Sequence, residues 1–95
     1  GDTNITAFSK TSAGEVNIGS SKLMANATGQ ATGLSADGPA VIKMNGTQIE
    51  VENDGAGGRG AWFKQSSKGD LINTIITAPN RALDVQDTSQ ITVTG

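Results

Sequence analysis

The stretch PAVIKMNGTQIEVE, residues 39–52, decides the fold that this sequence predicts. The dipeptide Asn45-Gly46 lies between two extended apolar runs, which is the strongest short-range signal of a β-hairpin. Both residues tolerate the positive φ that a tight two-residue turn requires. Six residues would pair across the strands to form its apolar face: Ala40, Ile42, Met44, Thr47, Ile49 and Val51. The stretch therefore predicts two antiparallel strands with a defined register.

Weaker strand signals surround this hairpin. Short runs of β-branched and apolar residues indicate strands at 4–10, 15–18 and 90–94, and residues 21–25 fit an extension of the strand at 15–18. A second hairpin is expected from 60–65 and 70–77, joined by the turn SSKG. The regular spacing of these short strands is typical of sandwiches and small barrels.

Two segments are less regular. Residues 80–86 fit either a short strand or one helical turn. Residues 26–38, with a doubled Ala-Thr-Gly, predict an irregular surface loop that is too short for a repeat architecture. We therefore expect a single domain over 1–95, all-β or with at most one short helix near 80–86. Its predicted architecture is a small antiparallel sandwich or barrel built from hairpins.

The stretch ENDGAGGRGAWF, residues 52–63, matches the G-x-G-x-x-G pattern of dinucleotide sites through Gly55, Gly57 and Gly60. That site needs a strand before the glycines and a helix after them. Here the preceding strand belongs to a hairpin, and Ser-Ser and Gly follow too early for a helix. No nucleotide cofactor is expected.

A calcium loop is the second alternative for this stretch, because Glu50, Glu52 and Asp54 alternate before a glycine. An EF-hand loop requires a bidentate Glu at its twelfth position, where this sequence has Ala61. No metal site is predicted, and a weak surface calcium site at the three carboxylates is the alternative.

The remaining interpretation is a Gly-rich connection between two hairpins. The residues expected to make the turns are Asn45, Gly46, Gly57, Gly58 and Gly60. The connection ends at Arg59 and Trp62, which are the candidate binding residues. Trp62 is either the main aromatic residue of the core or an exposed ring that stacks on a sugar, and the sequence leaves both open.

The composition excludes several classes of function. The chain has no Cys and no His, which removes thiol chemistry and the usual general base, so we expect no enzyme. Its net charge is −2 with no basic stripe, which argues against nucleic acid as a partner. No apolar run is long enough to span a membrane. Abundant Ser, Thr and Gly favour an extracellular, cell-surface or virion protein.

Residues 8–77 resemble the GG domain, also called the interleukin-like EMT inducer domain. The matching pieces are FSKTSAGEVNIG, Ile42 to Gly46, Gly58-Arg59-Gly60, Ala61-Trp62-Phe63, Ser67 to Asp70, and Leu71 to Ile76. The resemblance implies an α/β sandwich in an extracellular module, with relatives in carbohydrate-binding surface proteins and phage long tail fibres. It makes Gly58 and Gly60 structural and Arg59 a framework or rim residue. The sequence departs from the family at Thr77-Ala78-Pro79, where an aromatic-Asp step and a helix are missing.

Three functions follow as expectations. The first is a non-enzymatic structural or adhesive module of an extracellular or phage-fibre-like assembly, which packs against neighbouring subunits and contacts a surface glycan. The second is a self-assembling filament or capsid-decorating subunit, whose terminal strands complete a neighbouring copy's sheet. The strand residues for that assembly are Ile5, Ala7, Ile91 and Val93. The third is a small monomeric carbohydrate-binding domain that uses Trp62.

Overall fold

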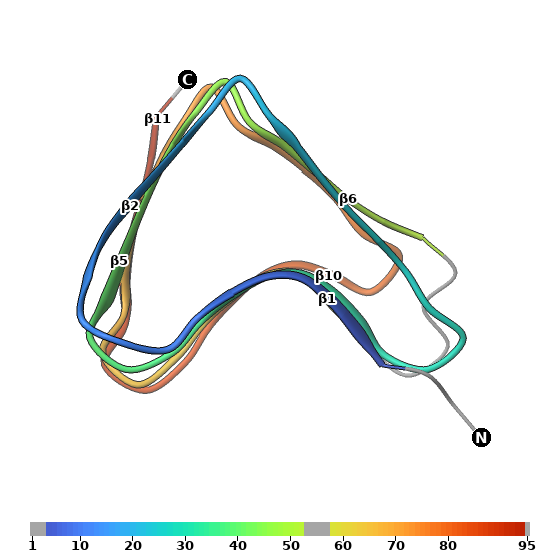
Figure 1. The fold of residues 1–95 in the computed structure, drawn as a ribbon, viewed down its shortest axis with the longest axis horizontal. Helices are drawn as coiled ribbons and strands as arrows, with labels where there is room; N and C mark the ends of the chain where they lie inside the picture. Colours follow the sequence, from blue (N-terminus) through green and yellow to red (C-terminus); the bar gives the residue numbers. More distant parts are fainter. Residues whose placement is uncertain (1–3, 53–57, 95) are drawn as a thin grey trace.

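The computed structural model describes residues 4–52 and 58–94, and these residues form eleven strands and no helix. The chain winds as a three-sided coil, a β-solenoid, which Figure 1 shows end-on. The strands are β1 (Ile5–Lys10), β2 (Gly14–Gly19), β3 (Lys22–Asn26), β4 (Ala31–Ala36), β5 (Ala40–Asn45), β6 (Gln48–Glu52), β7 (Arg59–Phe63), β8 (Lys68–Ile72), β9 (Ile75–Thr77), β10 (Arg81–Val85) and β11 (Gln90–Thr94).

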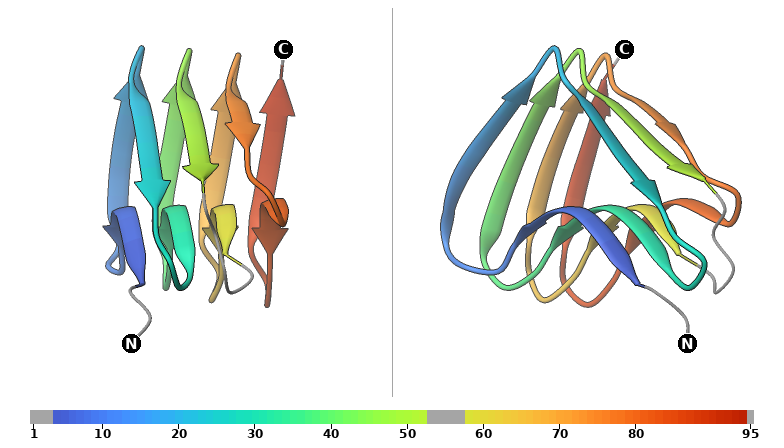
Figure 2. Two further views of the ribbon diagram at one scale, coloured as in Figure 1. Left: turned by 90° about the vertical axis from the view of Figure 1, so that its right-hand side faces the viewer. Right: turned by 45° about the vertical axis from the view of Figure 1, so that its right-hand side comes forward.

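Three parallel sheets make the sides of the coil, and Figure 2 shows their strands side by side. Face 1 has the order β1-β4-β7-β10, face 2 has β2-β5-β8-β11, and face 3 has β3-β6-β9. Each full turn of the chain adds one strand to each face. On face 1, Ile5 pairs with Ala31, Thr32 with Arg59, and Arg59 with Arg81. The step from β7 to β10 is therefore shorter than the two steps before it.

The all-β content agrees with the sequence prediction, but the antiparallel sandwich or barrel built from hairpins is wrong. Asn45-Gly46 turns the chain through a corner from face 2 to face 3 and does not reverse it. Only Gly46 is left-handed, with φ 69°, while Asn45 ends β5. The Gly46 N–H donates to the carbonyl of Ile72 on the next turn at 3.0 Å. A type I′ hairpin needs positive φ at both central residues, so a single left-handed residue gives a corner.

The same corner recurs on the neighbouring turns. Ser20 (φ 47°) and Asn73 (φ 48°) occupy the positions equivalent to Gly46. The N–H of Ser20 donates to the Asn45 carbonyl, and that of Asn73 to the Thr94 carbonyl. The corner is therefore a property of the coil, repeated with three different residue types.

The other expectations about local structure also change. The second hairpin is wrong, because β7 and β8 lie on different faces. Residues 80–86 contain strand β10, so the helical alternative is wrong. The expected surface loop at 26–38 contains β4, whose residues are mostly buried between β1 and β7. The repeat architecture that the sequence analysis rejected is the one that forms.

The core is a set of apolar columns, in which equivalent residues of successive turns stack inside the coil. Its largest fully buried apolar side chains are Leu34, Ile42, Met44, Ile49, Phe63 and Leu71. The columns join turns that lie far apart in sequence, as the pairings of Leu34 with Ala61 and of Met44 with Leu71 show. The core therefore joins each turn of the coil to its neighbours, as is typical of repeat architectures.

Face 1 bends inward between its ends, as the lower side of the coil in Figure 1 shows. Small residues fill the bend: Gly33 and Gly60 are equivalent, and Ala7 and Ala82 continue the column. A Cβ on Gly60 would lie 2.6 Å from the Ala82 carbonyl oxygen and closer still to Ile76 Cγ2. Gly60 is therefore structural, as expected, but it lies inside β7 and not in a turn.

Candidate functional site

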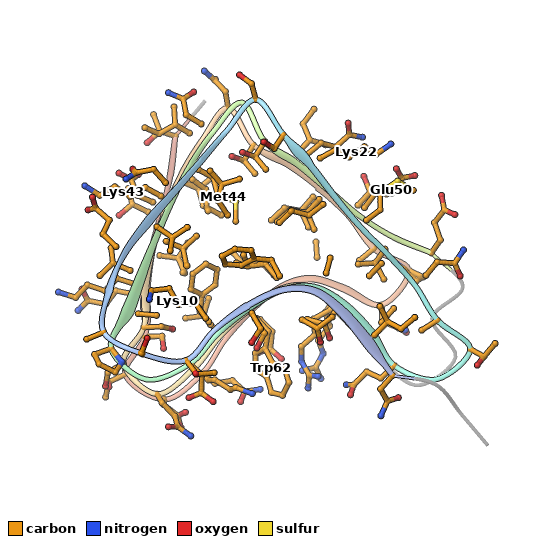
Figure 3. The ribbon with its side chains drawn as sticks, in the orientation of Figure 1. Lys10, Lys22, Lys43, Met44, Glu50 and Trp62 are labelled. Atoms are coloured by element: carbon orange, nitrogen blue, oxygen red, sulfur yellow. The ribbon has the colours of Figure 1, made fainter. Side chains whose placement is uncertain are left out.

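Trp62 lies on the outer side of face 1, below the ribbon in Figure 3. Strand alternation puts Ala61 and Phe63 in the core and turns Trp62 outward. The guanidinium carbon of Arg59 lies 3.8 Å from the centroid of the indole ring, and the Lys64 ammonium lies 3.6 Å from it. Trp62 is thus half-buried under two cations, in contacts that are attractive because of the ring quadrupole. A sugar could stack on the ring only by displacing one of them.

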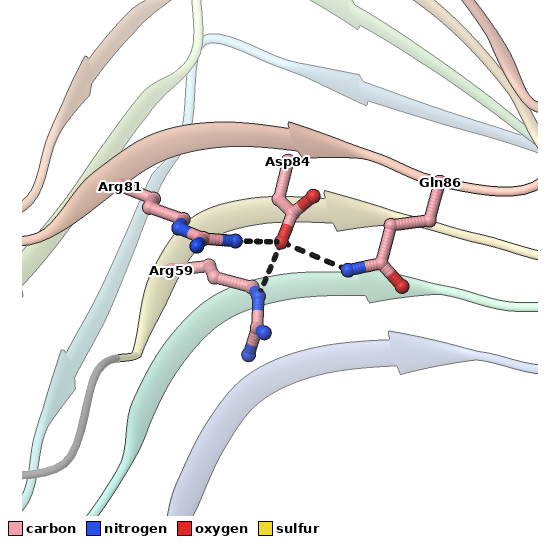
Figure 4. Close-up of polar contacts among 4 residues, drawn as sticks. All are labelled: Arg59, Arg81, Asp84 and Gln86. Atoms are coloured by element: carbon pink, nitrogen blue, oxygen red, sulfur yellow. Dashed lines mark hydrogen bonds and ion pairs between the residues drawn. The ribbon is translucent and has the colours of Figure 1, made fainter.

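Arg59 is held in place by Asp84 on the neighbouring strand β10 (Figure 4). Asp84 Oδ2 accepts from Arg59 Nε at 2.6 Å, from Arg81 Nη1 at 3.1 Å and from Gln86 Nε2 at 3.1 Å. The Arg59 and Asp84 side chains are only 15% and 10% exposed. This cluster joins the third turn of the coil to the fourth.

The same cluster sets the protonation of Asp84. The hydrogen bond from Arg59 lowers the pKa of the Asp84 carboxyl below its ordinary value, and burial opposes this only in part. A general base at neutral pH needs a pKa nearer to 7. The lowered pKa therefore suits a structural clamp between two turns better than proton transfer by Asp84. A binding role for Arg59 and Trp62 stays a prediction.

Of the three carboxylates proposed for calcium, the structure describes Glu50 and Glu52, whose side chains are close enough to interact. Glu50 and Glu52 both lie on β6, where Glu50 pairs with Lys22 at 2.8 Å (Figure 3). The Lys22 hydrogen bond lowers the pKa of Glu50. Asp54 and the predicted turn residue Gly57 lie outside the described residues. Within residues 4–52 and 58–94, no three metal-ligating side chains gather at one point.

The predicted assembly strands lie at opposite ends of the coil and on different faces. Ile5 and Ala7 are on β1, the edge of face 1, while Ile91 and Val93 are on β11, the edge of face 2. Sequence reasoning allowed a short strand at 80–86 but did not place β10 among the assembly strands, because the shorter last turn hides its alignment with β7. A search for repeats of unequal length is the signal that could have found it.

A shallow groove of about 210 Å³ lies on the outer side of face 2, beside the corner with face 3. Its lining residues come from β2, β5 and β8: Asn17, Ile18, Gly19, Lys43, Met44, Asn45, Asp70 and Ile72. No motif in the sequence joins them, because they become neighbours only through the winding of the chain.

Comparison with family models, curated proteins and solved structures finds no match to this chain. The resemblance to the GG domain therefore stays a prediction. None of the described segments forms a helix that is long and apolar enough to cross a membrane.

Proposed function

We propose that this chain is a non-enzymatic structural module of an extracellular or virion, fibre-like assembly, which packs further protein against the β10–β11 end of its solenoid. The supporting observation is the uncovered apolar surface of the last turn. Leu83, Val85 and Val93 are 37%, 42% and 64% exposed. Within the described residues β10 and β11 each have one strand neighbour. Apolar edge strands of this kind are templates for pairing with another chain.

The two ends of the coil differ in one inner column. Lys10 on β1 is equivalent to Ala36, Phe63 and Val85 on the later turns. Its ammonium lies 3.4 Å from both Ser12 Oγ and the Ala13 carbonyl oxygen, on the inner side of the ribbon in Figure 3. An inward-pointing lysine on an edge strand opposes pairing at that edge.

This difference favours the structural module over the self-assembling filament. Head-to-tail stacking of copies would place Lys10 of one copy against Val85 of the next, which costs desolvation of a charge. A module that packs through one end avoids that contact. The lack of His and Cys and the low aromatic content support the non-enzymatic, extracellular part of the proposal.

Sedimentation velocity over a wide range of protein concentration tests the proposal. Because two copies can cover their exposed apolar ends against each other when no other protein is present, we expect a limited, concentration-dependent association that Val93→Lys abolishes. Thr92→Lys is the matched control, because Thr92 is adjacent on β11 but points outward. A chain that stays monomeric throughout, or equal effects of the two lysines, would contradict the proposal. Open-ended filaments in electron micrographs would replace it with the self-assembling alternative.

A further inference from the structure

The groove on face 2 is built from two outward columns. Asn17, Lys43 and Asp70 stack in register in one column, and Gly19, Asn45 and Ile72 stack in the other. Gly19 contributes no side chain, which opens the groove at the first turn. A Cβ placed on Gly19 would meet only the Asn45 carbonyl oxygen, at 3.7 Å. The space at this position is therefore open.

The polar lining offers donors and acceptors together. Lys43 is a donor only, Asp70 is an acceptor only, and the amides of Asn17 and Asn45 do both. One positive and one negative charge face each other across neighbouring strands, and Glu15 pairs with Lys43 at 2.9 Å. The lining therefore has no excess of positive charge to select an anion. A neutral ligand whose hydroxyl groups both donate and accept fits this arrangement.

The apolar lining and the size of the groove narrow the ligand further. Ile72 is half-buried, and its side chain offers carbon surface beside the polar groups, whereas Ile18 and Met44 turn their side chains into the core and line the groove only with backbone. The volume of about 210 Å³ is smaller than the pockets that enclose drug-sized ligands. The groove thus has room for one small ring that carries hydroxyls on its edge and C–H groups on its face.

We propose that this groove binds one ring of a neutral saccharide, with its hydroxyls shared among Asn17, Lys43, Asn45 and Asp70. The site differs from the one that the sequence predicted, because two cations cover the Trp62 ring. It also goes beyond packing at the β10–β11 end, since it lies on the outer side of face 2 over β2, β5 and β8. A fibre module with this groove would contact glycans along its length.

Titration of ¹⁵N-labelled chain with methyl glycosides tests the site directly. The probes are methyl α-D-glucopyranoside, methyl β-D-galactopyranoside and methyl α-D-mannopyranoside, with glucuronate and inorganic sulfate as the charged comparisons. A single ring in an open groove should bind weakly, with a dissociation constant on the order of 10 mM. We expect at least one neutral glycoside to shift the side-chain amide signals of Asn17 and Asn45 and the backbone signal of Asp70.

Two variants make the result specific. Gly19→Val fills the groove and should weaken binding by about tenfold or more, while Asp70→Asn removes the acceptor charge and should weaken it less. Ser9→Val is the matched control, because Ser9 is exposed on the outer side of face 1. The spectra themselves show whether each variant is folded.

Three results would overturn the proposal: no shift with any neutral glycoside, equal shifts in Gly19→Val, or a preference for glucuronate or sulfate. None of them bears on end packing, which sedimentation measures separately. The two proposals can therefore fail independently.

Discussion

Gly60 gives the sharpest test of the solenoid, because its lack of a side chain lets face 1 bend toward face 3. In Gly60→Ala the new Cβ would lie 2.6 Å from the Ala82 carbonyl oxygen on the next turn, and closer still to Ile76 Cγ2. The Ala82 oxygen is backbone and cannot rotate away. The substitution must therefore push neighbouring turns apart or straighten the bend.

The expected cost follows from the packing of the bend. Inserting one methyl group into a filled site costs about 1 to 3 kcal/mol, and a Cβ only 2.6 Å from a backbone oxygen puts Gly60→Ala at the upper end of that range. Replacing glycine by alanine also reduces the entropy of the unfolded chain, which returns about 0.4 to 1 kcal/mol. We therefore expect Gly60→Ala to lower the free energy of unfolding by about 2 kcal/mol, a large part of the total for a small domain.

Urea denaturation followed by circular dichroism measures this effect against a matched control. Gly19→Ala makes the same chemical change on β2, where the new Cβ meets only ordinary contacts. With a slope of about 2 kcal/mol per molar urea, Gly60→Ala should lower the midpoint by about 1 M, while Gly19→Ala should leave it unchanged or raise it. The double variant Gly60→Ala/Ile76→Ala should be less destabilised than the sum of its parts. Equal midpoints for the two glycine variants would refute the inward bend.

Three further changes test other parts of the structure. Asp84→Asn should destabilise the chain by about 2 kcal/mol at pH 7. The pKa of Asp84 is lower in the folded chain than in the unfolded chain. The stabilisation from the ionised carboxylate is therefore complete above the unfolded pKa of about 3.9 and is lost as the pH falls through the folded pKa. Urea midpoints should therefore converge for wild type and Asp84→Asn toward pH 2, and a constant difference would contradict the clamp. Lys10→Leu should increase association in sedimentation, whereas Thr6→Leu on the outer side of β1 should not, and equal association would exclude Lys10 as a block to stacking. Ser20→Gly should raise the melting temperature by relieving its left-handed φ of 47°, whereas a fall would show that the corner depends on the Ser20 side chain.

The sequence predicts the strands well because they depend on local alternation of side chains. The runs at 4–10, 15–18 and 90–94 are strands in the structure, and Ile42 and Ile49 are both buried as expected. Their partners could not be predicted from the same signals. The alternation of side chains shows which side of a strand is apolar. It does not show whether the next strand pairs with it in a hairpin or lies on another face of a solenoid.

The period of the coil is present in the sequence but is weak. Thr6-Ala7-Phe8-Ser9 and Thr32-Gly33-Leu34-Ser35 are two copies of one pattern, one full turn apart. The third copy, Arg59-Gly60-Ala61-Trp62, keeps only the small residue in the bend. The step from β7 to β10 is also shorter than the step from β4 to β7, so no fixed offset aligns all four turns. A repeat that varies in both length and side chains is visible only when the stacking is known.

The candidate sites depend on this period more than the strands do. Asn17, Lys43 and Asp70 have nothing in common locally, and each is an ordinary polar residue on its own strand. Once the turns are aligned, they form one outward column beside the open position at Gly19. Trp62 shows the opposite case, since it is conspicuous in the sequence, yet Arg59 and Lys64 already occupy its ring. In this chain the proposed groove therefore depends on which positions stack, and no single residue of the sequence indicates it.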